Sequence, residues 1–130
     1  MGGHIADTCE RIRRGEAPVV GGDGSQVQDY VYVGDVARAN LLAMESTVTG
    51  DAFNIVGGQD TSQARIVEIA LEAASSTLTP EHRPLGPTPL PPIKRIGYSR
   101  DKAKDVLGWE PQVTIEDGIC LLYTSDAADE

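Results

Sequence analysis

The sequence is poor in the residues that build disulfides, metal sites and membrane spans. Its 130 residues include two cysteines, two histidines and 5% aromatic residues. Cys9 and Cys120 are too few for a disulfide framework or a thiolate zinc site, and His4 and His82 lack the spacing of metal ligands. No apolar run approaches the ~20 residues of a membrane-spanning helix, and no signal peptide is recognisable. We therefore expect a cytoplasmic protein with no metal site and no membrane partner.

Positive charge is also scarce. Eleven lysine and arginine residues face twenty aspartate and glutamate residues, which gives a formal net charge of -9. Nucleic acid phosphates repel so acidic a chain, so we expect no nucleic-acid partner. The 40% hydrophobic content is enough for a core, and the length indicates one modest domain or part of a larger one.

What the sequence does contain is a turn, a strand and a helix start in close succession over residues 22–37. Gly22-Asp23-Gly24 predicts a tight turn, because glycine accepts a positive φ. The β-branched and aromatic residues from Tyr30 to Val33 favour a strand. Asp35 stands where a helix N-cap is expected, and the helix is predicted to end near Glu45. Spacing alone leaves open whether this stretch is only structural or also binds a ligand.

The periodicity of apolar residues predicts further elements on either side. They are a helix over about 5–14, strands over 17–20 and 52–56, a helix capped by Asp60, Thr61 or Ser62, and a short helix capped by Ser99 with Ala103, Val106 and Leu107 on one face. Gly57-Gly58 lies between a strand and a helix, as phosphate-binding turns do. No Gly-x-Gly-x-x-Gly or Gly-Lys-Ser/Thr spacing is present there, which disfavours phosphate binding.

A proline-rich stretch from Thr79 to Ile93 is predicted to cross the surface as an extended loop. Lys94, Arg95 and Arg100 follow it and form a cationic patch in an acidic chain. This patch either is solvated or contacts an anionic ligand. The basic residues over 11–14 are expected to be a solvated helix end rather than an anion site.

The last part of the chain contains a predicted anchor and a predicted helix start. Trp109 follows Gly108 and is expected to pack back onto the preceding helix. Thr114-x-x-Asp117 has the pattern of a capping box and predicts the last helix. Residues 120–130 have no regular apolar period and resemble the translation of a transposase-type sequencing adaptor. We therefore expect residues 1–119 to be native and residues 120–130 to be a non-native tail.

Four motifs in order carry a family resemblance. They are Arg11 to Val20; Gly22 to Gln26 with Asp29 to Val33 and Asp35 to Ala37; Ala52 to Ile55 with Gly57-Gly58; and Ser99-x-x-Lys102-Ala103-x-x-x-Leu107-Gly108-Trp109-x-Pro111 with Glu116 to Ile119. Together they resemble the NAD-dependent epimerase/dehydratase family, which comprises extended short-chain dehydrogenase/reductases similar to UDP-glucose 4-epimerase. The resemblance covers nearly all of residues 15–119.

The resemblance implies an α/β fold that is the C-terminal part of a Rossmann-like extended short-chain dehydrogenase/reductase. Residues 1–119 are then the substrate-side portion with late Rossmann elements, and the N-terminal dinucleotide-binding half, which holds the NAD of the parent protein, is lacking. The family's catalytic Tyr-x-x-x-Lys pair is expected to be lacking too. No catalytic, cofactor-binding or metal residue is carried over onto this chain.

The resemblance also implies a substrate site. Its members are Val19, Val20, Gly21, Gly22 and Gln28 on the nucleotide side, with Arg95 on the diphosphate. Two positions depart from the common pattern, because Gly21 stands where many members have an aromatic residue and Gln28 where many have arginine. Glutamine carries no charge, so diphosphate binding is expected to depend on another cation, and Arg95 is the best candidate.

Two hypotheses about function follow. The first is the substrate-binding portion of an NAD(P)-dependent nucleotide-sugar epimerase or dehydratase, inactive alone, with a homodimeric parent protein left open. The alternative is a free-standing, non-catalytic binding or interaction module. The first predicts that Val36, Ala39, Phe53 and Ile55 lose part of the core they pack against, which would leave an exposed apolar patch.

Overall fold

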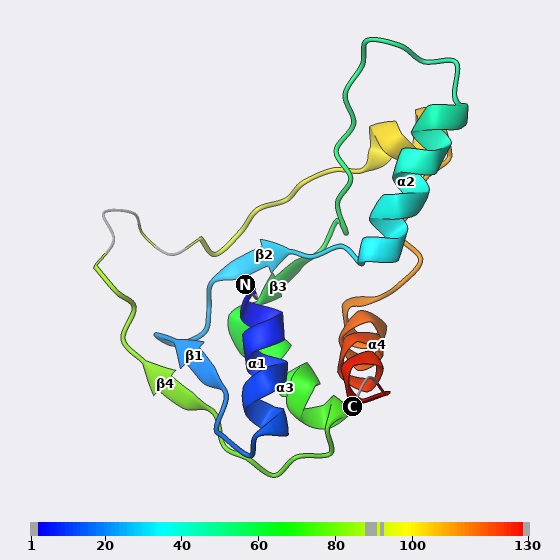
Figure 1. Ribbon diagram of the computed structural model, residues 1–130. Coiled ribbons are helices and arrows are strands. Elements are labelled where there is room, and N and C mark those ends of the chain that lie inside the picture. The colour runs from blue at the N-terminus through cyan, green and yellow to red at the C-terminus, as the bar shows by residue number, and fades with distance from the viewer. Residues whose placement is uncertain (1–2, 88–90, 92, 129–130) are drawn as a thin grey trace.

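The computed structural model describes residues 3–87, 91 and 93–128, and the side chains of these up to residue 124. The elements in chain order are α1 (His4–Arg13), β1 (Val19–Gly21), β2 (Val27–Asp29), α2 (Val33–Glu45), β3 (Asp60–Ser62), α3 (Gln63–Ala73), β4 (Glu81–Arg83), the π-helical turn η1 (Ala103–Leu107) and α4 (Ile115–Ala128). Helices α1, α3 and α4 form the body of the molecule. Helix α2, with η1 packed beside it, extends away from this body (Figure 1). None of the described helices is long and apolar enough to cross a membrane.

The strands form two short sheets. β1 pairs in parallel with β4, so that Val20 lies opposite His82. β2 pairs with β3 in the antiparallel sense, and Asp29 lies opposite Asp60. The predicted strand over 30–33 is wrong, because pairing with β3 ends at Asp29 and Val33 already begins α2.

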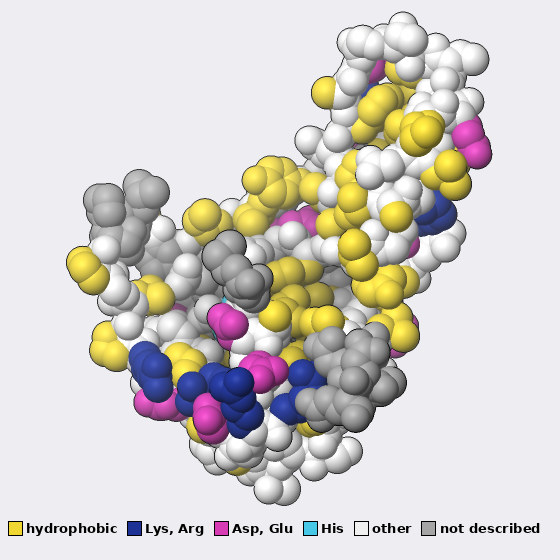
Figure 2. All heavy atoms as spheres, in the orientation of Figure 1, with side chains coloured by type: hydrophobic (Ala, Val, Ile, Leu, Met, Phe, Trp, Pro, Cys, Tyr) yellow, Lys and Arg dark blue, Asp and Glu magenta, His cyan; other side chains and the backbone are white. Residues whose placement is uncertain are grey.

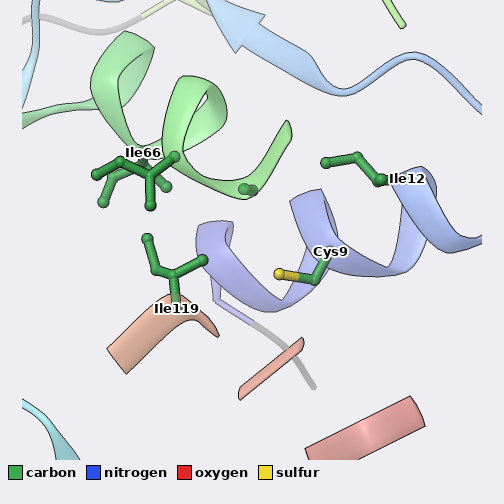
Figure 3. Close-up of a cluster of buried hydrophobic side chains, with 6 residues drawn as sticks. Cys9, Ile12, Ile66 and Ile119 are labelled. Carbon is green, nitrogen blue, oxygen red and sulfur yellow. The ribbon is translucent and has the colours of Figure 1, made fainter. Parts of the chain in front are cut away.

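The main core lies where α1, α3 and α4 meet. Its buried members are Cys9, Ile12, Ile66, Ile69, Ala70 and Ile119. Figure 3 shows Cys9 and Ile12 of α1 facing Ile66 of α3, with Ile119 of α4 closing the cluster. The predicted first helix is confirmed, and its apolar period is what supplies this contact.

A second, smaller core joins α2 to η1. Ala39, Ala103 and Trp109 are buried in it, and Phe53 and Ile55 pack against it half-buried. Trp109 is the expected packing anchor, since its side chain is 0% exposed and its Nε1 donates a hydrogen bond of 2.8 Å to the Asp35 carbonyl oxygen.

Asp35 is buried and is not the helix N-cap that the sequence predicted. The cap position of α2 is Tyr32, and Asp35 lies in the first turn. Its Oδ2 atom accepts hydrogen bonds of 3.0 Å from the backbone N–H groups of both Gln112 and Val113. The Asp35 carboxylate therefore ties the segment before α4 to α2.

The apolar patch on α2 differs from the expected one. Ala39 is buried by Trp109 instead of exposed. The exposed large hydrophobic side chains on this helix are Val33 (74%), Leu41 (53%) and Met44 (81%). Figure 2 shows apolar side chains gathered over α2.

The structure confirms two of the predicted helix caps, at α3 and α4. Ser62 is the cap of α3, because its Oγ accepts from the Arg65 N–H at 3.1 Å. Thr114 caps α4 through its Oγ1, which accepts from the Asp117 N–H at 3.1 Å.

Residues 52–56 are not a strand, because they pair with no other described segment. The helix after Ser99 is largely a π-helical turn, which leaves Val106 47% exposed instead of on a common apolar face.

Two further regions differ from a simple loop or tail. The proline-rich stretch contains β4, and its residues 88–90 and 92 lie outside the described residues. Helix α4 continues past residue 119 to Ala128, and Leu122 and Tyr123 pack against the main core. The origin of residues 120–130 stays a prediction. Neither Cys9 nor Cys120 forms a disulfide within the described part of the chain.

Candidate functional site

A cavity of about 350 Å³ opens beside β2, at a point where four segments far apart in the sequence meet. We call it the β2 cavity. It is lined by His4 at the start of α1, by residues 26–30 around β2, by Gln63 at the start of α3, and by Ile93, Ile96 and Tyr98 of the segment that follows the proline-rich stretch.

Backbone hydrogen bonds hold the last of these segments in place. The Val27 N–H donates to the Ile93 carbonyl oxygen at 2.8 Å. The Asp60 carboxylate accepts from the N–H groups of Ile96 (2.8 Å) and Gly97 (3.4 Å). Residues 93–97 are therefore fastened along the β2–β3 pair at both ends.

A line of amide contacts crosses the inner wall of the β2 cavity. The Gly21 N–H donates to Gln63 Oε1 at 2.7 Å, and Gln63 Nε2 lies 3.5 Å from His4 Nδ1. Burial lowers the pKa of the His4 imidazole, although contacts with Gln63 and the charge of Asp7 act in the opposite direction. Burial thus favours the neutral form of His4, and the one carboxylate among the lining residues, that of Asp29, is engaged by the N–H groups of Gly57 and Gly58.

The chemistry of this lining suits an uncharged polar group. Glutamine amides both donate and accept hydrogen bonds, as sugar hydroxyls and nucleobase edges require. Ile93, Ile96 and Tyr98 add the apolar and aromatic surface that small-molecule sites use for contact area. Lys94 and Arg95 are both exposed and stand between the lining residues Ile93 and Ile96, although neither lines the cavity itself. We call residues 93–97 the rim segment.

The structure brings one of the predicted site residues, Gln28, to the lining of this cavity, and Arg95 to the segment beside it. Gln28 is exposed on β2 and lines the β2 cavity. It also borders a neighbouring apolar cavity of about 420 Å³ between α1, the start of α2 and α4. Arg95 lies between Ile93 and Ile96, and no hydrogen bond or ion pair joins its side chain to any of the residues described.

The other predicted site residues lie on β1, to one side. Val20 is 1% exposed, so its side chain belongs to the interior of the described chain. Val19 and Gly21 border a separate cavity of about 570 Å³ next to α1 and residues 83–86. Gly22 donates its N–H to the Arg83 carbonyl oxygen at 2.7 Å. A role for these four residues in substrate binding stays a prediction.

Gly21 has a close neighbour that explains the missing side chain. A Cβ atom at this position would lie 2.9 Å from Leu85 Cδ2 and 3.1 Å from Gln63 Oε1. These distances are shorter than normal van der Waals contact. Leu85 and Gln63 therefore fill the space into which a side chain at position 21 would project.

The Gly57-Gly58 turn is closed to phosphate by the protein itself. Asp29 accepts from the Gly57 N–H at 2.6 Å and from the Gly58 N–H at 2.8 Å, one bond to each carboxylate oxygen. The Gly22–Gly24 turn leads into β2 and not into a helix. Neither glycine turn thus offers free N–H groups at a helix start to the pyrophosphate of a dinucleotide, and the described residues do not fit NAD.

The expectation that the chain lacks a Tyr-x-x-x-Lys spacing is wrong, because Tyr98 and Lys102 stand four residues apart. The spacing does not make a catalytic pair. Tyr98 lies before the first helical residue, and Lys102 Nζ is bound to Asp51 (2.5 Å) and the Ala52 carbonyl oxygen (2.8 Å). The Lys102 ammonium also lies 5.0 Å from the centre of the Phe53 ring. Lys102 therefore fastens a loop and is not available to lower the pKa of a tyrosine.

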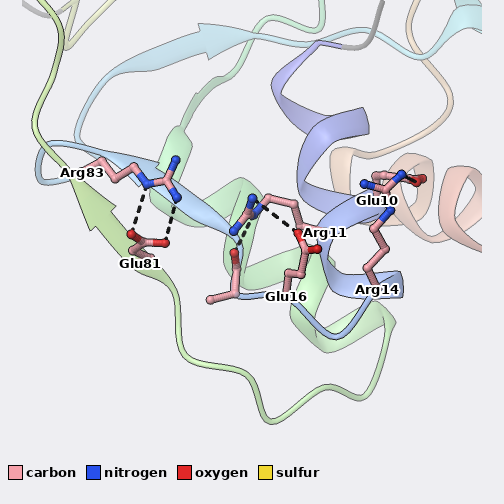
Figure 4. A network of polar contacts seen from close by, with 7 residues as sticks. Glu10, Arg11, Arg14, Glu16, Glu81 and Arg83 are labelled. Atoms are coloured by element: carbon pink, nitrogen blue, oxygen red, sulfur yellow. Dashed lines mark hydrogen bonds and ion pairs between the residues drawn. The ribbon is translucent and has the colours of Figure 1, made fainter.

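The predicted solvated helix end instead carries ion pairs, formed by Arg11 of α1 and by Arg14, the residue after it. Arg14 pairs with Glu10 at 2.8 Å and Arg11 with Glu16 at 3.5 Å. Figure 4 shows these pairs beside that of Arg83 and Glu81. Among the residues that the structure describes, no group of three or more His, Cys, Asp or Glu side chains could hold a metal ion.

Sequence reasoning missed most of the cavity lining. His4, Gln63, Ile93, Ile96 and Tyr98 come from three segments that no motif connects. Each is an ordinary residue of a helix start or a loop. The one available signal was Gln26 and Gln28 on a strand beside a glycine turn, which marks a polar edge of the sheet.

Comparison with known proteins places this fold and cavity in context. Residues 1–56 match the model of the NAD dependent epimerase/dehydratase family. The UDP-glucose 4-epimerase of Mycolicibacterium smegmatis is 32% identical over 117 residues, which cover 90% of this chain and 36% of that protein. The dTDP-glucose 4,6-dehydratase of Xanthomonas campestris pv. campestris strain B100 is 32% identical over 120 residues, covering 82% and 32%.

Solved structures agree. The UDP-glucose 4-epimerase of Thermotoga maritima with UDP-glucose matches with a TM-score of 0.85 and 36% identity, over 98% of this chain and 40% of that one. The UDP-glucuronic acid 4-epimerase of Bacillus cereus, in complex with UDP-glucuronic acid and NAD, matches in fold with a TM-score of 0.81 at 21% identity, over 96% and 40%. The chain thus spans little more than a third of the length of these relatives.

Proposed function

We propose that this chain, which belongs to the NAD-dependent epimerase/dehydratase family, is the nucleotide-sugar side of an NAD(P)-dependent epimerase or dehydratase and is inactive alone. Its fold is the corresponding part of an extended short-chain dehydrogenase/reductase. The proposed substrate is a nucleotide-activated sugar.

One observation carries the proposal: the β2 cavity has an amide-rich wall, and two exposed cations stand in the segment that supplies its lining residues Ile93 and Ile96. Gln28 and Gln63 offer donors and acceptors to a base or a sugar. Lys94 and Arg95 stand between the lining residues Ile93 and Ile96, and in this proposal they supply the positive charge that a diphosphate joining the base and the sugar would need. A net charge of -9 makes such local positive charge necessary for any anionic ligand.

In this proposal the described residues bind and orient the substrate. NAD is proposed as the cofactor of the parent protein, because related solved structures are NAD complexes. The described residues do not fit NAD, so no hydride-transfer step is assigned to them. Recovery of the gene upstream of this segment tests the enzyme itself. A parent sequence without a Gly-rich βαβ unit and a helical Tyr-x-x-x-Lys pair would overturn it.

Titration of the ¹⁵N-labelled chain with UDP-glucose tests the binding role directly. We expect the side-chain amide signals of Gln26, Gln28 and Gln63 to shift together. Gln28→Ala should weaken binding roughly 3- to 10-fold, since it removes about one hydrogen bond. Gln59→Ala, which removes an exposed amide away from the β2 cavity, is the matched control and should not change the affinity. Absence of any shift at millimolar ligand would contradict the proposal.

A further inference from the structure

We infer that Asp60 is a positioning residue, whose carboxylate holds the segment of Arg95 at the rim of the β2 cavity so that this cation can meet the substrate diphosphate. The inference rests on the proposed function and extends it to a residue outside the predicted site. Asp60 itself lies on β3 and does not line the cavity.

The Asp60 carboxylate holds one end of the rim segment by two hydrogen bonds. Its Oδ2 accepts from the Ile96 N–H at 2.8 Å and its Oδ1 from the Gly97 N–H at 3.4 Å. The other end is held by the Val27 N–H, which donates to the Ile93 carbonyl oxygen. The two residues between these anchors are Lys94 and Arg95. Without the carboxylate, only the anchor at Ile93 would remain.

The register of β2 and β3 indicates that an aspartate at position 60 lowers the stability of the sheet unless other contacts compensate its charge. Asp60 lies directly opposite Asp29 across the antiparallel pair. Like charges in that arrangement destabilise a sheet. Each carboxylate is compensated by two backbone N–H groups of a different loop, Asp29 at Gly57 and Gly58 and Asp60 at Ile96 and Gly97. Asp29 and Asp60, which lie opposite each other, thus hold two different loops, one at Gly57 and Gly58 and one at Ile96 and Gly97.

The charges around the segment indicate which cations are free to bind an anion. Arg100 donates to the Gly57 carbonyl oxygen, and Lys104 pairs with Glu110 at 3.2 Å. Lys94 and Arg95, in contrast, form no ion pair within the described part of the chain. Of the predicted cationic patch, the portion that Asp60 holds in place is therefore the portion that remains available to a ligand.

The sign of one mutational effect separates positioning from simple charge. Asp60→Ala removes a negative charge near the rim, so Coulomb attraction alone predicts tighter binding of a diphosphate. Positioning predicts the opposite. We expect Asp60→Ala to weaken UDP binding at least 5-fold and to leave uridine binding within 2-fold, because uridine has no phosphate. Asp105→Ala, an exposed site with the same change of charge, is the control and should leave both affinities unchanged.

The full experiment titrates the whole chain with UDP and with uridine, in the variants Asp60→Ala, Asp60→Asn, Arg95→Ala and the Asp60→Ala/Arg95→Ala double mutant. If Asp60 acts through Arg95, the double mutant binds UDP no more weakly than Arg95→Ala alone. Additive losses, or an Asp60→Ala variant that binds UDP as well as the native chain, would overturn the inference while the proposed function stands. A native chain that binds neither ligand overturns both.

Asp60→Asn decides the question if Asp60→Ala does not fold. Asparagine keeps one acceptor oxygen, so it can retain one of the two bonds to the rim segment. We expect Asp60→Asn to fold, to bind UDP more weakly than the native chain does, and to bind uridine with the native affinity. Native UDP affinity in a folded Asp60→Asn variant would count against a positioning role.

Discussion

At the scale of single residues, Asp35 is the side chain on which the placement of the C-terminal segment depends most. It is 3% exposed and satisfies the Gln112 and Val113 N–H groups. We predict that Asp35→Ala lowers the free energy of unfolding by about 2–3 kcal/mol, because those donors lose their acceptor in a partly buried place. Urea denaturation followed by circular dichroism measures the change. Asp101→Ala, at an exposed position, serves as the control and should stay within about 0.5 kcal/mol.

The roles of single residues could be predicted from the sequence only in part. Asp35 was recognised as important from its place before an apolar period, but its role as a cap is local and the observed role is long-range. Gln28 and Arg95 were proposed from the family resemblance; Gln28 lines the β2 cavity and Arg95 stands between two lining residues, and their role in substrate binding stays a prediction. Asp60 was considered only as a helix cap, because its partners at Ile96 and Gly97 lie far along the chain. A partner so remote leaves no trace in local spacing.

At the scale of elements, the Gly22–Gly24 turn is fixed by close packing as well as by backbone conformation. Gly24 has φ +74°, and a Cβ there would lie 2.7 Å from both Ala64 Cβ and Val20 Cγ1. We predict that Gly24→Ala costs about 2–4 kcal/mol of stability, from positive-φ strain together with overlap against α3 and β1. Gly50→Ala is the matched control, since Gly50 has φ +68° but open space around it. Strain alone should cost about 1 kcal/mol there.

Chemical denaturation of the two glycine variants side by side checks this prediction. Equal losses would mean that backbone strain explains both and that the packing of the turn against α3 contributes nothing.

The elements also show which parts of a fold a sequence can predict. Helices α1 and α3 and the start of α4 follow from apolar periodicity and caps, which are local signals. The strands, each of three residues, exist only because a distant segment pairs with them, as β4 does with β1. Residues 52–56 have the composition of a strand but no described partner, so composition alone misled the prediction.

At the scale of the whole molecule, the two separate cores predict that unfolding has two steps. The main core draws on α1, α3 and α4, whereas the smaller one around Trp109 buries only Ala39 and Ala103 beside it. We predict that Trp109 fluorescence changes at a lower urea concentration than far-ultraviolet circular dichroism, because the smaller core has less buried apolar area to protect it. Trp109 is the single tryptophan, so the signal is specific.

The same measurement separates the two hypotheses about function. Coincident transitions would indicate one cooperative unit, as the free-standing module requires, and would contradict the prediction. Separate transitions fit a chain whose exposed α2 side chains, Leu41 and Met44, are covered in a longer parent protein.

The meeting of α1 with α4 has a consequence for how the chain is made. During synthesis Ile12 leaves the ribosome before Ile119, the residue of α4 that completes the same cluster. Until then Cys9 and Ile12 can pack only against α3, and one side of the cluster stays open to solvent. The cluster can therefore close only after α4 has left the ribosome, and α1 keeps part of its apolar face exposed until then.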